Sequence, residues 1–356
     1  MPDVDVVVAG AGIWGCTVAR RLAEAGRRVL VLEKRQVIGG NCRCEDRDGI
    51  EIHLYGSHIF HTAIPKVWDF VRRFTDFNGY QHKVLAHYHG KTYFLPLGLA
   101  LINKFFGVEL KPGEVSDFMK DPARSAAIFD AFFRGYTSKQ WGRPPEEIDP
   151  SIIKRVPVRN SYDVNYFNDW WQGIPSEGYN RLFERMLDHP NISVECGRAF
   201  DLKSFAGDVD AVYYSGPIDA LFGFRFGALP WRSLRFETET LDVADHQGTT
   251  VVNYTEADVP YTRIHEFKHY HPERKDVMSA EKTVIMREFP KTWEPGDEPY
   301  YPIDDEKSRA LLKRYQDEVA KANADVPYRL VVGGRLGGYR YFDMDKSVNA
   351  ALELEI

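Results

Sequence analysis

The chain has 356 residues, of which 44% are apolar and 28% are charged, and its net charge is −6. Because a single core stops growing beyond ~250–300 residues, this length predicts more than one domain. The composition excludes a disordered or fibrous chain, and the acidic balance of mixed charges disfavours nucleic-acid binding, so local arginines must hold any anionic ligand.

The N-terminus carries no basic leader, and no apolar run approaches the ~20 residues of a membrane helix. We therefore expect a cytoplasmic protein without a membrane span. The cysteines are Cys16, Cys42, Cys44 and Cys196. We expect all of them to be reduced, since the close pair could form only a strained disulfide.

The first segment has the pattern of a dinucleotide-binding β-α-β unit. A β-branched run leads into Gly10-x-Gly12-x-x-Gly15, which precedes a helical pattern and a second apolar run that closes with Glu33. Backbone N–H groups at such a turn bind a pyrophosphate, and an acidic residue at this spacing accepts hydrogen bonds from a ribose. The alternative is a tight strand-to-helix turn without a ligand.

Gly39-Gly40-Asn41 follows shortly after Glu33. A glycine pair lets the backbone pass close to a second phosphate or a ribityl chain, which favours FAD over a nicotinamide cofactor. A flexible turn is the alternative. His58 and His61 lack Cys, Asp or Glu at metal-ligand spacing, so we expect no metal and consider a place beside an isoalloxazine ring as probable a role as a structural one.

The middle of the chain changes from helical to β-prone patterns. Residues 97–142 are helical and rich in Phe, whereas 158–180 and 220–300 contain short β-prone runs that indicate an antiparallel sheet. Residues 209–215 and 328–333 resemble buried parallel strands, so we expect them to return to the first sheet.

Aromatic and arginine side chains provide candidates for a nucleotide pocket. Each aromatic taken singly is more often a core residue, and each arginine more often makes a surface ion pair. The aromatics are Phe132, Phe133, Tyr136, Trp141, Tyr166, Phe167, Trp170 and Trp171, and the arginines are Arg155, Arg159, Arg263, Arg335 and Arg340.

Several separated runs together resemble the UDP-galactopyranose mutase family. They are Tyr55-Gly-Ser-His58-Ile-Phe-His61-Thr, Gly135-Tyr136-Thr137-x-Lys139-Gln140-Trp141, Val259-Pro-Tyr261-Thr-Arg263-Ile, Pro299-Tyr300-Tyr301-Pro302-Ile303 and Gly334-Arg335-Leu-Gly337. The resemblance extends nearly from end to end.

The resemblance implies an α/β fold with a discontinuous Rossmann-like FAD-binding domain, a small helical domain and a twisted antiparallel sheet domain. The expected boundaries are 1–62, 185–220 and 328–356 for the FAD-binding domain, 97–157 for the helical domain with a mobile loop, and 63–96, 158–184 and 221–327 for the sheet domain. It also implies a reaction without net redox, in which N5 of reduced FAD attacks the anomeric carbon and the sugar recloses as a furanose. NAD(P)H or dithionite would reduce the flavin, and the substrate would be UDP-galactopyranose.

The same resemblance assigns roles to individual residues. Arg155 and Arg263 would grip the diphosphate, and His58 and His61 would lie near the isoalloxazine as further catalytic candidates. The substrate would contact Phe132, Phe133, Tyr136, Thr137, Trp141, Tyr166, Tyr301 and Tyr341. The cofactor would contact Gly10, Gly12, Gly15, Glu33, Gly39, Gly40, Asn41, Arg335, Asp343 and Met344.

One departure from the family leaves alternatives open. The helical segment between Pro96 and Tyr136 is shorter than in the usual bacterial enzyme, where it builds a dimer contact and shapes the nucleotide pocket. The chain could therefore be a homodimer or not, and a GDP-linked hexose or UDP-N-acetylgalactosamine stays open as substrate. A flavin amine oxidase-like oxidoreductase is the alternative from another class.

Overall fold

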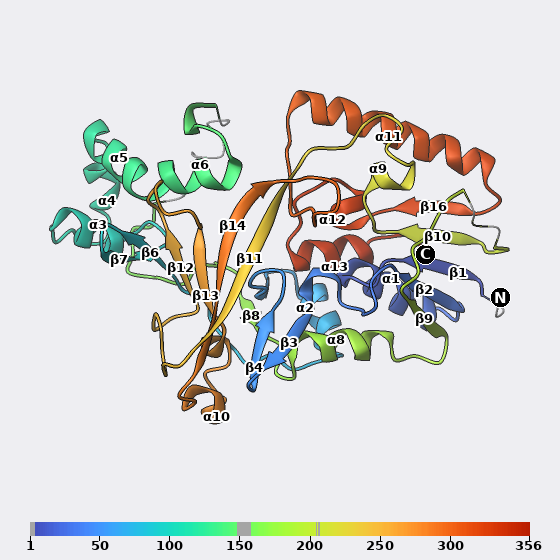
Figure 1. The fold of residues 1–356 in the computed structure, drawn as a ribbon, viewed down its shortest axis with the longest axis horizontal. Coiled ribbons are helices and arrows are strands. Elements are labelled where there is room, and N and C mark those ends of the chain that lie inside the picture. Colours follow the sequence, from blue (N-terminus) through green and yellow to red (C-terminus); the bar gives the residue numbers. More distant parts are fainter. Residues whose placement is uncertain (1–3, 148–157, 204, 206) are drawn as a thin grey trace.

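The computed structural model describes residues 4–147, 158–203, 205 and 207–356. A five-stranded parallel sheet with the order β16-β10-β1-β2-β9 forms one half of the molecule (Figure 1). Its strands are β1 (Val6–Ala9), β2 (Val29–Glu33), β9 (Ile192–Cys196), β10 (Ala211–Tyr214) and β16 (Arg329–Val332). The predicted β-α-β unit and the two returning strands are confirmed, since β10 and β16 pair in parallel beside β1.

Helices cover both faces of this sheet. Val6 and Val8 of β1 join the core beneath α1, whereas Val7 and Ala9 join a separate core on the other face, which Val319 of α11 contacts. Successive side chains of a strand point to opposite faces, which explains why β1 is apolar throughout. The helices around the sheet are α1 (Ile13–Glu24), α2 (Pro65–Val71), α8 (Gly178–Leu187), α9 (Ile218–Leu221), α11 (Glu306–Asp325), α12 (Gly334–Gly337) and α13 (Met344–Leu352).

The packing differs from the expected domain boundaries at two helices. Residues 63–96 and 158–184 were assigned to the antiparallel sheet, but α2 packs against α13 and α8 packs against α1. The reason is burial, because the apolar faces of both helices, including Val67 and Phe183, belong to the core under the parallel sheet. The other boundaries stay predictions.

A seven-stranded sheet with the order β15-β11-β14-β13-β12-β6-β7 forms the centre of Figure 1. It is antiparallel except between β12 and β6, which run parallel. Its strands are β6 (Val84–Tyr88), β7 (Lys91–Leu95), β11 (Trp231–Leu241), β12 (Val251–Tyr254), β13 (Arg263–Glu266), β14 (Thr283–Thr292) and β15 (Tyr301–Pro302). Two small sheets pair β3 (Cys44–Arg47) with β4 (Ile50–His53) and β5 (Phe60–Thr62) with β8 (Trp171–Gly173).

Short helices gather at one end of this sheet, at the upper left of Figure 1. They are α3 (Leu99–Phe106), α4 (Val115–Phe118), α5 (Pro122–Phe129), a π-helical turn (Asp130–Arg134) and α6 (Gly135–Trp141). A core of their own, which includes Leu101 and Ile128, joins them to Tyr93 of β7. The remaining short helices are Gly40–Cys42, Pro145–Glu147, Phe267–Tyr270 and α10 (Lys275–Met278).

Across the described part of the chain, none of the helices has the length and apolar character needed to cross a bilayer.

Buried neutral histidines make this fold sensitive to acid. Burial lowers the pKa of His82 from 6.5 to about 3, so below pH 6.5 the unfolded chain binds a proton that the folded chain does not. Stability from this group is present above pH 6.5 and falls as the pH drops, by ~1.4 kcal/mol per pH unit. In urea unfolding between pH 6.5 and 4.5, His82→Asn should flatten the pH dependence by about this slope. His246→Asn, at an exposed position, is the matched control, and equal slopes in His82→Asn and wild type would contradict the account.

Candidate active site

The turn between β1 and α1 requires glycine for steric reasons. Gly10 has a φ of +110°, and a Cβ there would lie 2.1 Å from Ser215 Oγ. A Cβ on Gly15 would lie 1.9 Å from the carbonyl oxygen of Gly10. Gly12 precedes the first residue of α1 and has no side chain to cap it, so the first N–H groups of this helix are available to an anion.

A second glycine turn lies directly against the first. Gly39 N donates to Ala11 O at 2.9 Å, and a Cβ on Gly40 would lie 3.0 Å from Gly12 Cα. Asn41 is fixed nearby, since its Oδ1 accepts a hydrogen bond from the Arg35 guanidinium at 2.8 Å. The two turns together form a side-chain-free cradle, which fits a pyrophosphate approached by backbone on two sides.

Glu33 ends β2 beside this cradle and is buried. Its Oε2 accepts from Ala11 N at 2.8 Å and its Oε1 accepts from Arg35 N at 2.9 Å. Each carboxylate oxygen has a second lone pair, so Glu33 can also accept from ribose hydroxyl groups.

The C-terminal part of the chain closes the same region. Met344 begins α13 after Asp343, and Cys42 Sγ lies 3.5 Å from Met344 Sδ. Arg335 Nε donates to Phe342 O at 2.9 Å, and its guanidinium lies 5.1 Å from the ring centre of Tyr341. The predicted cofactor residues therefore converge from the N-terminal and C-terminal segments, and the residues present fit a dinucleotide.

Arg263 of β13 is the centre of the predicted substrate side. Its guanidinium donates a hydrogen bond to the Tyr136 hydroxyl of α6, and its Nε lies 3.5 Å from Glu288 Oε1 of β14. Burial alone would lower the pKa of Arg263, but Glu288 outweighs it, so that pKa stays above the ordinary value. Arg263 Nε is buried, and no described residue accepts a hydrogen bond from it.

Two further tyrosines lie beside this group. The rings of Tyr301 and Tyr341 stack with centres 5.8 Å apart. Burial raises the pKa of Tyr301, while the nearby charge of Arg263 opposes that rise. Its phenol therefore stays protonated and is able to donate to an anionic oxygen.

A buried hydrogen-bond chain supports Arg263 from below, and the sequence analysis missed it. The Tyr270 hydroxyl donates to Ser57 Oγ, Ser57 Oγ lies 2.5 Å from His265 Nδ1, and His265 Nε2 lies 3.2 Å from Glu288 Oε2. Burial opposes ionisation of Glu288, but Arg263 and His265 hold its pKa below the ordinary value. A charged residue within the apolar run of β14 was the available signal, although its partner could not be identified from sequence.

His58 and His61 have different surroundings. His58 Nδ1 lies 2.6 Å from Gly56 O, so Nδ1 donates, and burial lowers the pKa of this histidine to about 3. His61 Nδ1 lies 2.5 Å from Asp169 Oδ2, and its ring stacks on Phe167 with centres 3.7 Å apart. His58 is therefore neutral at physiological pH, whereas His61 is held by a carboxylate.

Two buried cations that sequence reasoning missed fix α6 to the sheet. Lys139 Nζ donates to four backbone carbonyl oxygens, those of Tyr254, Glu256, Val259 and Tyr261, at 2.7–3.0 Å. Burial lowers the pKa of Lys139 to about 8, partly opposed by Glu256. Arg232 of β11 donates from Nε to Gln140 O at 2.9 Å. These contacts place Tyr136 of α6 against Arg263, and Lys139 within the Gly135–Trp141 motif was their signal in the sequence.

The predicted aromatic pocket residues are not all in equivalent places. Phe132 is buried among Tyr88, Tyr93 and Phe105 in the helical core, so its placement indicates packing rather than substrate contact. Phe133 packs against the same core. Thr137 and Trp141 are half-buried on α6, and Tyr166 is 41% exposed beside His82. Arg155 lies outside the described residues.

Two groups of side chains have ligand atoms close enough to suggest a metal ion. In the group of Cys44, Glu51 and His53, His58 N donates to His53 Nδ1 at 3.0 Å, so Nε2 of a neutral His53 carries the proton and cannot ligate. In the group of Asp245, Glu266 and His269, the carboxylate of Glu266 already accepts from His246 N, Gln247 N and Thr283 Oγ1. The geometry thus favours hydrogen bonding over metal binding in both groups.

Comparison with known proteins tests the resemblance. The family model described as UDP-galactopyranose mutase matches residues 131–341, and a model of an NAD(P)-binding Rossmann-like domain matches residues 8–74. A protein of Klebsiella pneumoniae, named as a probable UDP-galactopyranose mutase, is 38% identical over 99% of this chain and 94% of its own length. The chain belongs to the UDP-galactopyranose mutase family. It is therefore an isomerase of nucleotide sugars, and membership of this flavoprotein family implies a flavin in the Rossmann-like domain.

Two more relatives of this mutase family member bear on its activity and fold. The dTDP-fucopyranose mutase of Escherichia coli is 36% identical over 98% of the chain and 96% of its own length. A crystal structure of a reduced UDP-galactopyranose mutase has a TM-score of 0.74, is 18% identical, and covers 98% of this chain and 94% of that one. The structure confirms the fold, and the two mutases confirm the reaction class over the oxidoreductase alternative.

The glycine cradle gives a direct test of the flavin site. Gly10→Ala and Gly26→Ala both place alanine at positive φ, which costs roughly 1–2 kcal/mol, but only position 10 lacks space for a Cβ. Gly10→Ala should purify without yellow colour, whereas Gly26→Ala should retain its flavin. The flavin absorbance per protein measures this. Full flavin content in Gly10→Ala would show that the cradle is not the cofactor site.

Proposed function

We propose that this enzyme converts UDP-galactopyranose into UDP-galactofuranose with reduced FAD, and that Arg263 holds the diphosphate. Arg155 is proposed as the second arginine of the grip. NAD(P)H or dithionite would reduce the flavin. When bound, the reduced flavin supplies the nucleophile for the anomeric carbon, and the chain's own residues supply binding and orientation.

The observation that carries the proposal is the state of Arg263. Its side chain is 29% exposed, so one side reaches the surface while its Nε is buried without a hydrogen-bond acceptor among the described residues. A buried charged donor without an acceptor is unfavourable, and a diphosphate oxygen would satisfy it. The hydroxyl groups of Tyr136 and Tyr301 add donors for the same anion.

Glu288 and His265 set the charge balance around Arg263. The buried carboxylate neutralises the guanidinium while no anion is bound and fixes its direction. A neutral His58 adds no further positive charge, because burial keeps its pKa at about 3. The diphosphate should therefore meet one oriented cation from the described residues rather than a diffuse positive field.

A second candidate substrate is dTDP-fucopyranose, favoured by the similar identity of its mutase to this chain. Both candidates carry a pyrimidine nucleoside diphosphate, so the grip of Arg263 would serve either one. The GDP-linked hexose and UDP-N-acetylgalactosamine alternatives lack a relative of this kind among the mutases compared above. A dimer contact through α3 to α6 stays a prediction, which light scattering tests.

The first test removes the proposed diphosphate contact. Arg263→Ala should lower kcat/KM by ~10²–10³-fold, as the loss of one charged donor does in other enzymes, and Arg263→Lys should recover only part because an ammonium lacks the forked geometry. Arg235→Ala, at an exposed arginine of β11 that pairs with Glu237, is the matched control and should retain full activity. Near-native turnover by Arg263→Ala would remove Arg263 from the site.

The second test identifies the substrate. Dithionite-reduced enzyme should convert UDP-galactopyranose with a higher kcat/KM than dTDP-fucopyranose, a GDP-linked hexose or UDP-N-acetylgalactosamine, as measured by chromatography of the furanose product. Oxidised enzyme without reductant should be inactive. A higher kcat/KM for dTDP-fucopyranose would replace the proposed substrate without changing the reaction class.

A further inference from the structure

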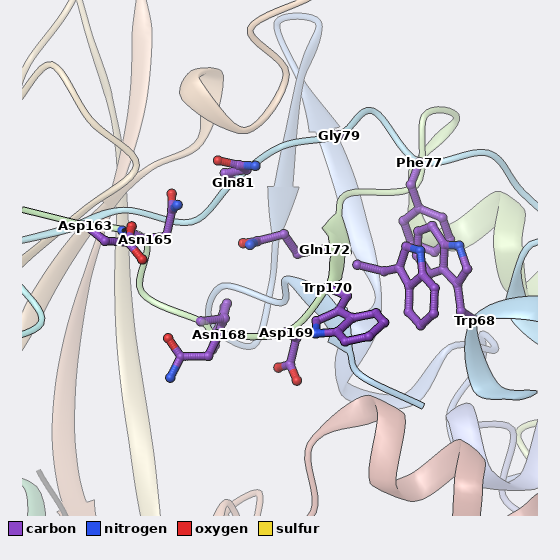
Figure 2. Close-up of a pocket in the computed structure, with 12 residues that line it drawn as sticks. Trp68, Phe77, Gly79, Gln81, Asp163, Asn165, Asn168, Asp169, Trp170 and Gln172 are labelled. Atoms are coloured by element: carbon purple, nitrogen blue, oxygen red, sulfur yellow. Dashed lines mark hydrogen bonds between the residues drawn. The ribbon is translucent and has the colours of Figure 1, made fainter. Parts of the chain in front are cut away.

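A pocket of about 480 Å³ lies outside the residues assigned to flavin and diphosphate (Figure 2). It lies between the segment that leads from α2 into β6 and the segment 163–172 that leads into β8. Its volume is in the range of small-molecule sites. No predicted contact of the mutase reaction lines it, so its chemistry has to be considered separately.

One side of the pocket is aromatic. Trp68 stacks on Trp171 with ring centres 5.9 Å apart and packs against Phe77 at 4.7 Å. Trp170 stands at 57° to Trp171, so the rings form a corner rather than a flat surface. Trp170 is 84% exposed, although burying an aromatic ring of this size is strongly favourable. Figure 2 shows its indole at the open pocket rather than packed into the core.

The facing side is made of amides (Figure 2). Gln172 Oε1 accepts from His82 N at 2.9 Å and Asn168 Oδ1 accepts from Arg159, which fixes both side chains and leaves their NH2 groups to donate. Gln81 is exposed and offers both a donor and an acceptor. The pocket thus presents fixed hydrogen-bonding groups opposite a large apolar corner.

The charges of the pocket exclude an anionic ligand. Its lining contains no lysine or arginine. Its two carboxylates are also compensated, because Asp169 bonds His61 at 2.5 Å and Asp163 lies 3.5 Å from the Arg159 guanidinium. A nucleoside diphosphate would find no cation here, and a cationic ligand would find no free carboxylate.

We propose that this pocket is a second binding site that takes an uncharged hexose unit. A sugar ring has an apolar C–H face that stacks on an indole and hydroxyl groups around its edge that exchange hydrogen bonds with amides. The corner of Trp170 and Trp171 matches the first feature, and Gln81, Asn168 and Gln172 match the second. Asp169 connects this pocket to His61, so a bound sugar would lie beside the candidate active site and not within it.

The test is a binding experiment on the flavin-loaded enzyme, with UDP present so that the active site is occupied. The probes are methyl β-D-galactopyranoside and methyl β-D-galactofuranoside, followed by saturation-transfer NMR. At least one should bind saturably, and Trp170→Ala should weaken that binding by about tenfold or more. Phe94→Ala, at an aromatic side chain of β7 that is 45% exposed, is the matched control and should bind as the wild type does.

Flavin content confirms that Trp170→Ala is folded, which its exposure predicts. No saturable binding of either glycoside, or equal affinity in Trp170→Ala and wild type, would overturn the proposal. Tetramethylammonium serves as a third probe, and its binding in place of the sugars would overturn the proposal in favour of a cation site. Turnover is not the readout, so failure here would leave the proposed mutase reaction untouched.

Discussion

The buried contact between Arg263 and Glu288 is the constraint on which the site depends. Placing an ion pair among the strands of a sheet is expensive, because both charges lose water. Here the carboxylate is nearly inaccessible and accepts from His265 and Thr262, so its position is determined by β13 and β14 together. The guanidinium is thereby aimed before any ligand arrives, which lowers the cost of ordering it on binding.

The same sheet also positions the helical segment. Lys139 and Arg232 bind backbone carbonyl oxygens across the boundary between α6 and the strands, and Gly135 permits the close approach, since a Cβ there would lie 2.3 Å from Thr255 O. Tyr136 is carried by this helix to the guanidinium of Arg263. The helix, the sheet and the parallel-sheet domain thus meet around one anion site, and the glycine cradle provides the cofactor site next to α1.

Local patterns made the parallel sheet predictable. The run before Gly10, the helix after Gly15 and the strand that ends at Glu33 each have a signature within a few residues, and all three lie where the sequence indicated. The links among Glu288, His265, Ser57 and Tyr270 have no such signature, because they join strands and loops far apart in the chain. Aromatic density likewise could not separate Phe132, which packs in a core, from Trp170, which is exposed, since burial depends on tertiary packing.

The most direct measurement of the central claim is a crystal structure of the reduced enzyme with UDP-galactopyranose. The account predicts that the diphosphate oxygens lie within hydrogen-bond distance of Arg263 and Tyr136, with the Glu288 contact to Arg263 retained. A diphosphate bound elsewhere, with Arg263 paired only to Glu288, would contradict the account.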